Sequence, residues 1–218
     1  MGIESLESNL KKPKSEGLEF FNLDAKQKKE LASKVSESGG LVRIFIHPIS
    51  GWTSDEITEN QDRVTQVLKR TIYSEKSPPI IILENDHLAE QWKKIFENTP
   101  PPKDIYIVPT IWNFSYPIVP NNPNLPERDE EGRLKQNTET DKYITEGFIK
   151  LIETLNEAGV KKILLGGTKL EIEDGHLYRC VGNFINMLQD LTRKEIKLSL
   201  GTAPLNRNDL RKSRPDLI

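Results

Sequence analysis

The sequence contains very little cysteine and no long apolar run. Cys180 is the only cysteine among 218 residues, so the chain cannot form an internal disulfide, as is typical of proteins in a reducing compartment. No stretch approaches the roughly 20 apolar residues that a membrane-spanning helix needs, and Met1 is not followed by the apolar core of a secretory signal. We therefore expect a cytoplasmic protein with no membrane partner.

An excess of charge of either sign is also missing. The chain has 31 basic and 33 acidic side chains, for a net charge of −2. Proteins that bind nucleic acid usually carry a basic face, and nothing in this balance favours one. Hydrophobic residues make up 35% of the chain, which is enough to build a folded core rather than a disordered segment.

Short apolar runs alternate with segments of helical periodicity along most of the chain. Strands are predicted at 41–46, 80–83, 105–108, 161–165 and 195–200, and helices at 25–35, 55–73, 87–97, 141–158 and 176–191. Such alternation is typical of a parallel sheet with helices on both faces. We predict an α/β fold, a three-layer αβα sandwich around a five-stranded, mostly parallel, Rossmann-like sheet. With strands numbered along the chain, the expected order is 3-2-1-4-5.

Two regions lie outside this alternation. Residues 1–40 are expected to form a polar N-terminal arm and a surface helix, the arm being anchored by Leu18, Phe20 and Phe21, while 41–218 form a single α/β domain. The proline-rich stretch at about 114–140 has no periodicity. A loop of that length in a compact domain is usually functional or disordered, and its place after the third strand makes it a candidate lid.

All three histidines are predicted to lie where a strand ends or the following helix begins. In parallel sheets the carboxyl ends of the strands share one edge, and such folds bind ligands there. His47, His87 and His176, together with Asp86 and Cys180, are the candidate catalytic residues, because imidazole, carboxylate and thiol can transfer protons or attack substrates. The candidate ligand-binding residues at the same edge are Ser50, Gly51, Trp52, Glu84, Trp112, Asn113, Gly166, Gly167 and Thr168.

Several of these residues have more than one interpretation. The histidines could bind zinc, iron or manganese together with carboxylates, but no HxH, HxxxH or HExxH pair is present, so metal and cofactor stay open. Gly166 and Gly167 could hold an anion, whereas a tight turn with positive φ is the favoured interpretation. The tryptophans could stack on a flat ligand or anchor loops.

Cys180 also takes part in a family resemblance. It is expected about one turn into its helix, with His176 one turn earlier on the same face. The stretch from Ile163-Leu-Leu-Gly-Gly to Cys180-Val181-Gly182, with the order of the elements over 41–202, resembles the isochorismatase-like cysteine hydrolases. The resemblance implies a sheet sandwiched by helices and a nucleophilic cysteine at the helix after the fourth strand, which Cys180 matches. It also implies an aspartate after the first strand and a lysine after the third, where this chain has His47 and Thr110-Ile-Trp-Asn113.

Three functions agree with these features. The first is an enzyme of small-molecule metabolism, a hydrolase or transferase, with its site at the carboxyl edge of the sheet. The second is a non-catalytic binding or interaction module of the same fold, favoured by the missing aspartate and lysine and compatible with a homo-oligomer. The third is a nucleotide- or sugar-phosphate-binding domain that uses Gly166 and Gly167.

Overall fold

A computed structural model describes residues 20–48, 66, 70–72, 74, 78–85, 105–110, 117, 119, 130, 138–167, 170–173, 176–192, 194–202, 212 and 214–217. The strands in this part of the chain are β1 (Leu41–Ile46), β2 (Ile80–Asn85), β3 (Ile105–Thr110), β4 (Lys162–Gly167), β5 (Glu171–Glu173), β6 (His176–Tyr178) and β7 (Glu195–Thr202). The helices are η2 (Phe20–Asn22), α1 (Ala25–Glu37), α4 (Thr138–Glu157), α5 (Arg179–Leu191) and η3 (Pro215–Leu217).

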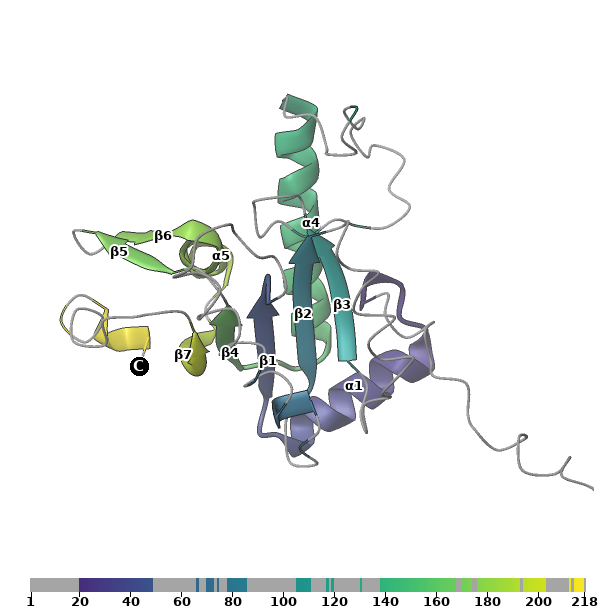
Figure 1. Cartoon of the computed structure of the whole chain (residues 1–218). Coiled ribbons are helices and arrows are strands. Elements are labelled where there is room, and N and C mark those ends of the chain that lie inside the picture. The colour runs from purple at the N-terminus through teal and green to yellow at the C-terminus, as the bar shows by residue number, and fades with distance from the viewer. Residues whose placement is uncertain are drawn as a thin grey trace, which may run out of the picture.

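The main sheet has five strands in the order β3-β2-β1-β4-β7, and every neighbouring pair is parallel (Figure 1). This is the order predicted from the sequence, and the α/β class is confirmed. The chain passes from β3 on one side of β1 to β4 on the other, so β1 lies at the centre. The carboxyl ends of β1 and β4 are therefore neighbours, with Ile46 in register with Gly167.

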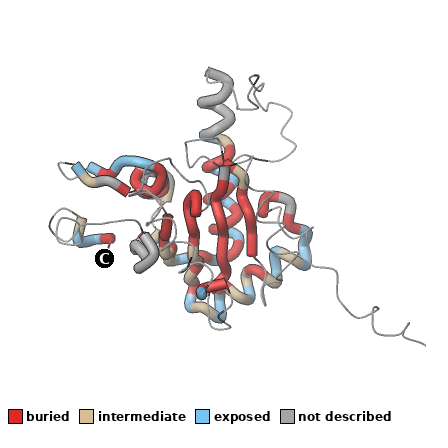
Figure 2. The backbone as a smooth tube through the Cα atoms, viewed as in Figure 1, coloured by how far each residue is buried: buried red, intermediate tan, exposed pale blue. Residues whose placement is uncertain are grey.

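Most described residues of β1, β2 and β3 are buried, on both faces of the sheet, as Figure 2 shows by the red strands at its centre. On one face Val42, Ile44 and Ile46 of β1 join a core cluster with residues of α1, α4 and α5. On the other face Phe45 of β1 and Ile82 of β2 are fully buried. Burial on both faces is typical of parallel strands and explains their continuous apolar sequence.

The first helix follows the prediction closely. The Asp24 side chain accepts hydrogen bonds from the backbone of Lys26 and Gln27, and the Gln27 side chain accepts one in return from the Asp24 backbone. This capping box satisfies amide groups that have no partner within the helix. Leu31 and Val35 then bury one face of α1 against the core. The later helix, α4, begins at Thr138, three residues before the position expected from periodicity.

The segment around residues 171–178 differs from the prediction. The expected helix from His176 is wrong at its start, because His176 belongs to β6, which pairs with β5 as a separate antiparallel hairpin. Helix α5 begins only at Arg179, whose φ of 68° is left-handed and marks the change from strand to helix. Leu177 is buried in β6, although its spacing from the apolar residues of α5 also fits one face of a helix. The apolar spacing was therefore misleading.

The glycine pair of β4 also contradicts its favoured interpretation. Gly166 and Gly167 end a strand instead of forming a tight turn, and Gly167 has no positive φ. A Cβ atom on Gly167 would lie 2.5 Å from Val181 Cγ2 and 2.8 Å from the Ile46 carbonyl oxygen. Glycine is therefore needed there for close packing of α5 on the sheet. Of the described helices, none is both long and apolar enough to span a membrane.

Candidate functional site

His47 is placed directly after the central strand β1, as predicted. Its backbone amide donates a hydrogen bond to the Leu83 carbonyl of β2 at 2.7 Å, so the residue is still attached to the sheet. Its φ of 50° is left-handed, a conformation that few residues other than glycine adopt. The side chain is only 1% exposed. His47 is thus a buried histidine whose backbone has an uncommon, left-handed conformation.

The His47 ring lies against Thr110, the last residue of β3. The distance from His47 Nε2 to Thr110 Oγ1 is 2.8 Å, and both side chains are buried. In the sheet, β2 separates β1 from β3, so this hydrogen bond spans the carboxyl end of β2. The left-handed turn at His47 lets its side chain reach that far. Sequence reasoning did not select Thr110 as a site residue, although a hydroxyl at the end of an apolar strand was a usable signal.

Burial determines the charge of this imidazole. Removal from water lowers the pKa of His47 from 6.5 to about 3, because desolvation disfavours the charged form. His47 is therefore neutral at physiological pH. A neutral imidazole has one N–H donor and one acceptor nitrogen. It can therefore either donate a hydrogen bond to an uncharged polar group or accept one from it.

Thr110 is held by a second contact on its outer side. It forms an isolated antiparallel bridge with Pro117. Pro117 in turn lies against α4 at Gly147, where an added Cβ would be 2.0 Å from the Pro117 carbonyl oxygen. The end of β3 is thus fixed between His47 on one side and the Pro117–Gly147 contact on the other.

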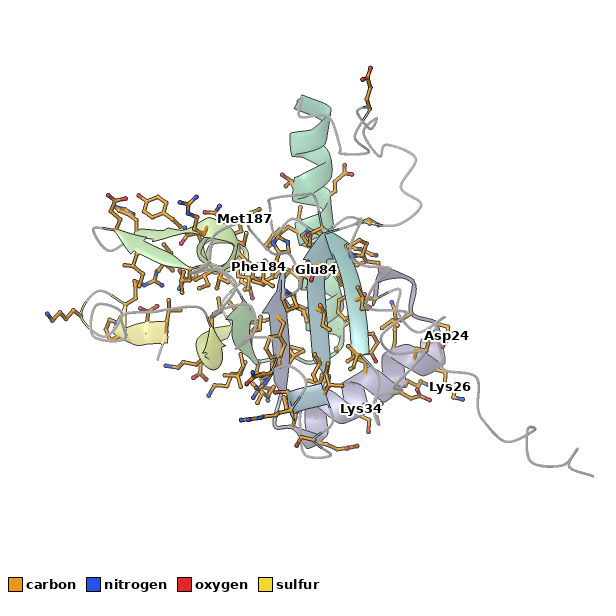
Figure 3. The ribbon with its side chains drawn as sticks, viewed as in Figure 1. Asp24, Lys26, Lys34, Glu84, Phe184 and Met187 are labelled. Carbon is orange, nitrogen blue, oxygen red and sulfur yellow. The ribbon has the colours of Figure 1, made fainter. Side chains whose placement is uncertain are left out.

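Glu84 is also buried at this end of the sheet, near the carboxyl end of β2 (Figure 3). It lies within β2 and not after it, next to Leu83, which belongs to the core cluster. Side chains alternate between the faces of a strand, so Glu84 is on the opposite face from Leu83. The same alternation places Thr110 on the face of Tyr106 and Val108, which are core-cluster residues too. Glu84 and the His47–Thr110 pair therefore lie on opposite faces of the sheet.

The other two candidate catalytic residues of the described chain do not have the expected arrangement. His176 is exposed on β6, where its ring lies 6.4 Å from the ring of Tyr178. Cys180 is the second residue of α5 and is buried in the hydrophobic core cluster. The predicted pairing of the two one turn apart on a helix is therefore wrong, because only Cys180 belongs to the helix.

The remaining candidates are His87, Asp86, Ser50, Gly51, Trp52, Trp112, Asn113 and Thr168, which lie outside the described residues, as does most of the expected lid at 114–140. Within the described ranges, no three His, Cys, Asp or Glu side chains are grouped so that they could hold a metal ion. The site that can be built from this part of the chain consists of His47, Thr110 and the backbone contacts that fix them.

Comparison of the chain with known protein families, with curated proteins and with solved structures finds no match. Functional inference therefore depends on the geometry of the site.

Proposed function

We propose that this protein binds a small, uncharged polar molecule at the carboxyl edge of its sheet, with His47 and Thr110 as the recognition pair. The observation that supports this most is the buried hydrogen bond of 2.8 Å between His47 Nε2 and Thr110 Oγ1. It lies at the sheet edge where open α/β folds bind their ligands. An amide or another carbonyl compound fits the hydrogen-bonding capacity of this pair.

The energetics of His47 favour a functional role over a structural one. A left-handed conformation at a residue other than glycine costs about 1 kcal/mol or more, and such positions cluster at functional sites. Burying a polar ring brings a further desolvation penalty, which its hydrogen bonds only offset. An apolar pair at these two positions would avoid the desolvation penalty, so burial alone does not explain why polar side chains are found there.

The neutral state of the ring indicates which chemistry it can perform. A general base works best when its pKa is near the working pH, and a pKa of about 3 makes His47 a weak base at neutral pH. A neutral imidazole can instead donate a hydrogen bond to a carbonyl oxygen and polarise it, as neutral histidines do in some enzymes. A hydrolase at this edge would use His47 for that purpose.

The family resemblance supports the same location. It implies catalytic side chains after the first and third strands, and in this chain His47 and Thr110 occupy those two strand ends. Their contact supports a site formed jointly by β1 and β3. The replaced side chains and the core burial of Cys180 favour a second candidate function, a non-catalytic binding module of the same fold. In either case a reducing cytoplasm suits a chain whose single cysteine, Cys180, forms no disulfide.

The test combines ligand binding with turnover. Full-length protein is titrated with acetamide, benzamide and benzoate while its thermal midpoint is followed, and hydrolysis of p-nitrophenyl acetate is measured in parallel. His47→Asn keeps a residue that tolerates left-handed backbone, and Thr110→Val removes only the hydroxyl. His176→Asn on exposed β6 is the matched control.

We expect an uncharged amide to raise the midpoint of the wild type and of His176→Asn, and to bind at least tenfold more weakly to the other two variants. Esterase activity that depends on His47 would assign a hydrolase, and binding without turnover would assign a binding module. Equal amide binding by wild type and His47→Asn, or no amide binding by the wild type, would contradict the proposal.

A further inference from the structure

Arg43 is a half-buried cation in the central strand, on the sheet face that is remote from the core cluster. Its neighbours Val42 and Ile44 belong to that cluster, so alternation places Arg43 on the opposite face together with Phe45. Burial lowers the pKa of the Arg43 guanidinium from its ordinary value because desolvation disfavours the charge. Arginine nevertheless stays protonated.

Residues that are in register across neighbouring strands form a row across the sheet, and the strand register places a second cation in the row of Arg43. Arg43 of β1 is in register with Leu164 of β4, and Leu164 is in register with Lys197 of β7. Residues in register in a parallel sheet face the same way, and two strand spacings separate the Cα atoms of Arg43 and Lys197 by roughly 10 Å. The half-buried Leu164 lies between them, and the Lys197 side chain, at the outer end of the row, donates to the Asp216 carbonyl oxygen of η3 at 3.1 Å. The adjacent row carries Lys162 and Glu195, which pair with each other at 2.9 Å.

On this face of the sheet, the exposure of the side chains increases from β2 toward β7. Ile80 of β2, which is next to Arg43 in the same row, is fully buried. Arg43, Leu164 and Lys197 are all of intermediate exposure, and Glu195 is exposed. The row therefore runs from the interior to the surface, and Arg43 lies where a ligand arriving from solvent could still reach it.

Within the described part of the chain, few groups compensate the charge of Arg43. Among the described residues its side chain contacts one hydrogen-bonding group, the Thr71 hydroxyl, at 3.4 Å from Nη1. Its Nε atom is buried and has no hydrogen-bond partner in that part of the chain. A donor left unsatisfied in this way is costly, and most such groups in native proteins are satisfied or have a function. A guanidinium presents its donors as a planar fork that matches a phosphate or carboxylate.

We propose that Arg43, flanked by Lys197 in the same row, forms a site for a phosphate group of a small ligand. The site is separate from the His47–Thr110 pair, since Thr110 lies on the other face of the sheet. A tetrahedral dianion would accept hydrogen bonds from the fork of the half-buried Arg43 guanidinium. It would also offset the charge of Arg43, whose row has no carboxylate among the described strand residues.

The experiment uses full-length protein and inorganic phosphate. Its thermal midpoint is followed during titration with sodium phosphate and with sodium chloride at equal ionic strength, and the phosphate affinity is measured by calorimetry. Arg43→Met removes the guanidinium, and Arg43→Lys keeps the charge but loses the fork. Lys150→Met, an exposed site on α4, makes the same charge change away from the row.

We expect phosphate to stabilise the wild type and Lys150→Met beyond the effect of chloride. Binding should weaken at least tenfold in Arg43→Met and by a smaller factor in Arg43→Lys. A structural arginine gives a different readout: Arg43→Met would then be less stable in phosphate-free buffer, whereas the proposal expects no loss there. Phosphate that acts no better than chloride, or that binds Arg43→Met as tightly as wild type, would overturn the proposal.

Discussion

At the scale of single residues, the buried His47 gives the protein a specific dependence on pH. The unfolded chain takes up a proton on this residue near pH 6.5, while the folded protein takes it up only near pH 3. Between these values the unfolded state binds more protons, so the free energy of unfolding rises with pH through this window and falls as the solution is acidified. Above about pH 7 His47 contributes no further slope.

We therefore predict that acidification from about pH 6 to pH 5 lowers the free energy of unfolding by up to roughly 1 kcal/mol through His47 alone. Urea unfolding at a series of pH values measures this slope, and His47→Asn should flatten it. The lowered pKa values of Glu157 and Asp216 act in the same direction but only at lower pH, where carboxyl groups begin to protonate. An unchanged slope in His47→Asn would show that its ring is solvated in the folded state.

At the scale of elements, periodicity and alternation were sufficient to predict the five strands of the main sheet and their order, but not the β5–β6 hairpin. They were insufficient where one pattern of apolar residues fits both a strand and a helix. The spacing of Leu177, Val181 and Phe184 suits a helix, yet Leu177 is buried from a strand and Arg179 changes the backbone direction without a glycine to signal it. A contact such as His47–Thr110 could not be predicted either, because it depends on a left-handed backbone at a single residue.

The packing of α4 provides a test at this scale. Glycine inside a helix usually destabilises it by about 1 kcal/mol relative to alanine, so Gly147→Ala would be expected to stabilise an isolated α4. In the folded protein the new methyl group would lie 2.0 Å from the Pro117 carbonyl oxygen, a backbone atom that cannot move without displacing the bridge to Thr110. The steric term should exceed the gain in helix propensity.

We predict that Gly147→Ala lowers the free energy of unfolding by about 1–3 kcal/mol, the range found for overpacked interiors. Glu153→Ala on the exposed side of α4 is the control and should change stability by less than about 0.5 kcal/mol. Chemical denaturation followed by circular dichroism gives both values. A stabilised Gly147→Ala variant would mean that α4 does not approach Pro117 closely.

At the scale of the whole molecule, a short helix packs against each edge strand of the main sheet. The edge strand β3 contacts η2, and the opposite edge strand β7 contacts η3. On the β7 side, Leu217 is fully buried and the Lys197 side chain donates to the Asp216 carbonyl oxygen at 3.1 Å. Exposed edge strands invite pairing with other chains, and covering them is one way proteins avoid aggregation. The two short helices thus cover the edge strands of the sheet and add buried side chains to the core.

Phe20 is the main contact on the β3 side. It is 1% exposed, and its ring packs edge-on against Tyr106 of β3 with centroids 5.5 Å apart. Truncating a buried phenylalanine to alanine typically costs about 3–5 kcal/mol. Because Phe20 also joins η2 to β3, Phe20→Ala should both lower the free energy of unfolding by that amount and uncover part of the edge. Phe20→Leu fills much of the same volume, so a smaller loss of about 1 kcal/mol is expected.

Denaturation and light scattering separate these two effects. At a temperature where Phe20→Ala is still folded, association that rises with protein concentration would show that η2 protects the edge of β3. Leu188→Ala, which removes a buried side chain of α5, lowers stability at a different place and serves as the comparison for a variant whose η2 contact and Pro117 bridge on β3 are both unaltered. If Phe20→Ala is as monomeric as that variant, η2 contributes packing only, and the protection of β3 must come from the Pro117 bridge at its carboxyl end.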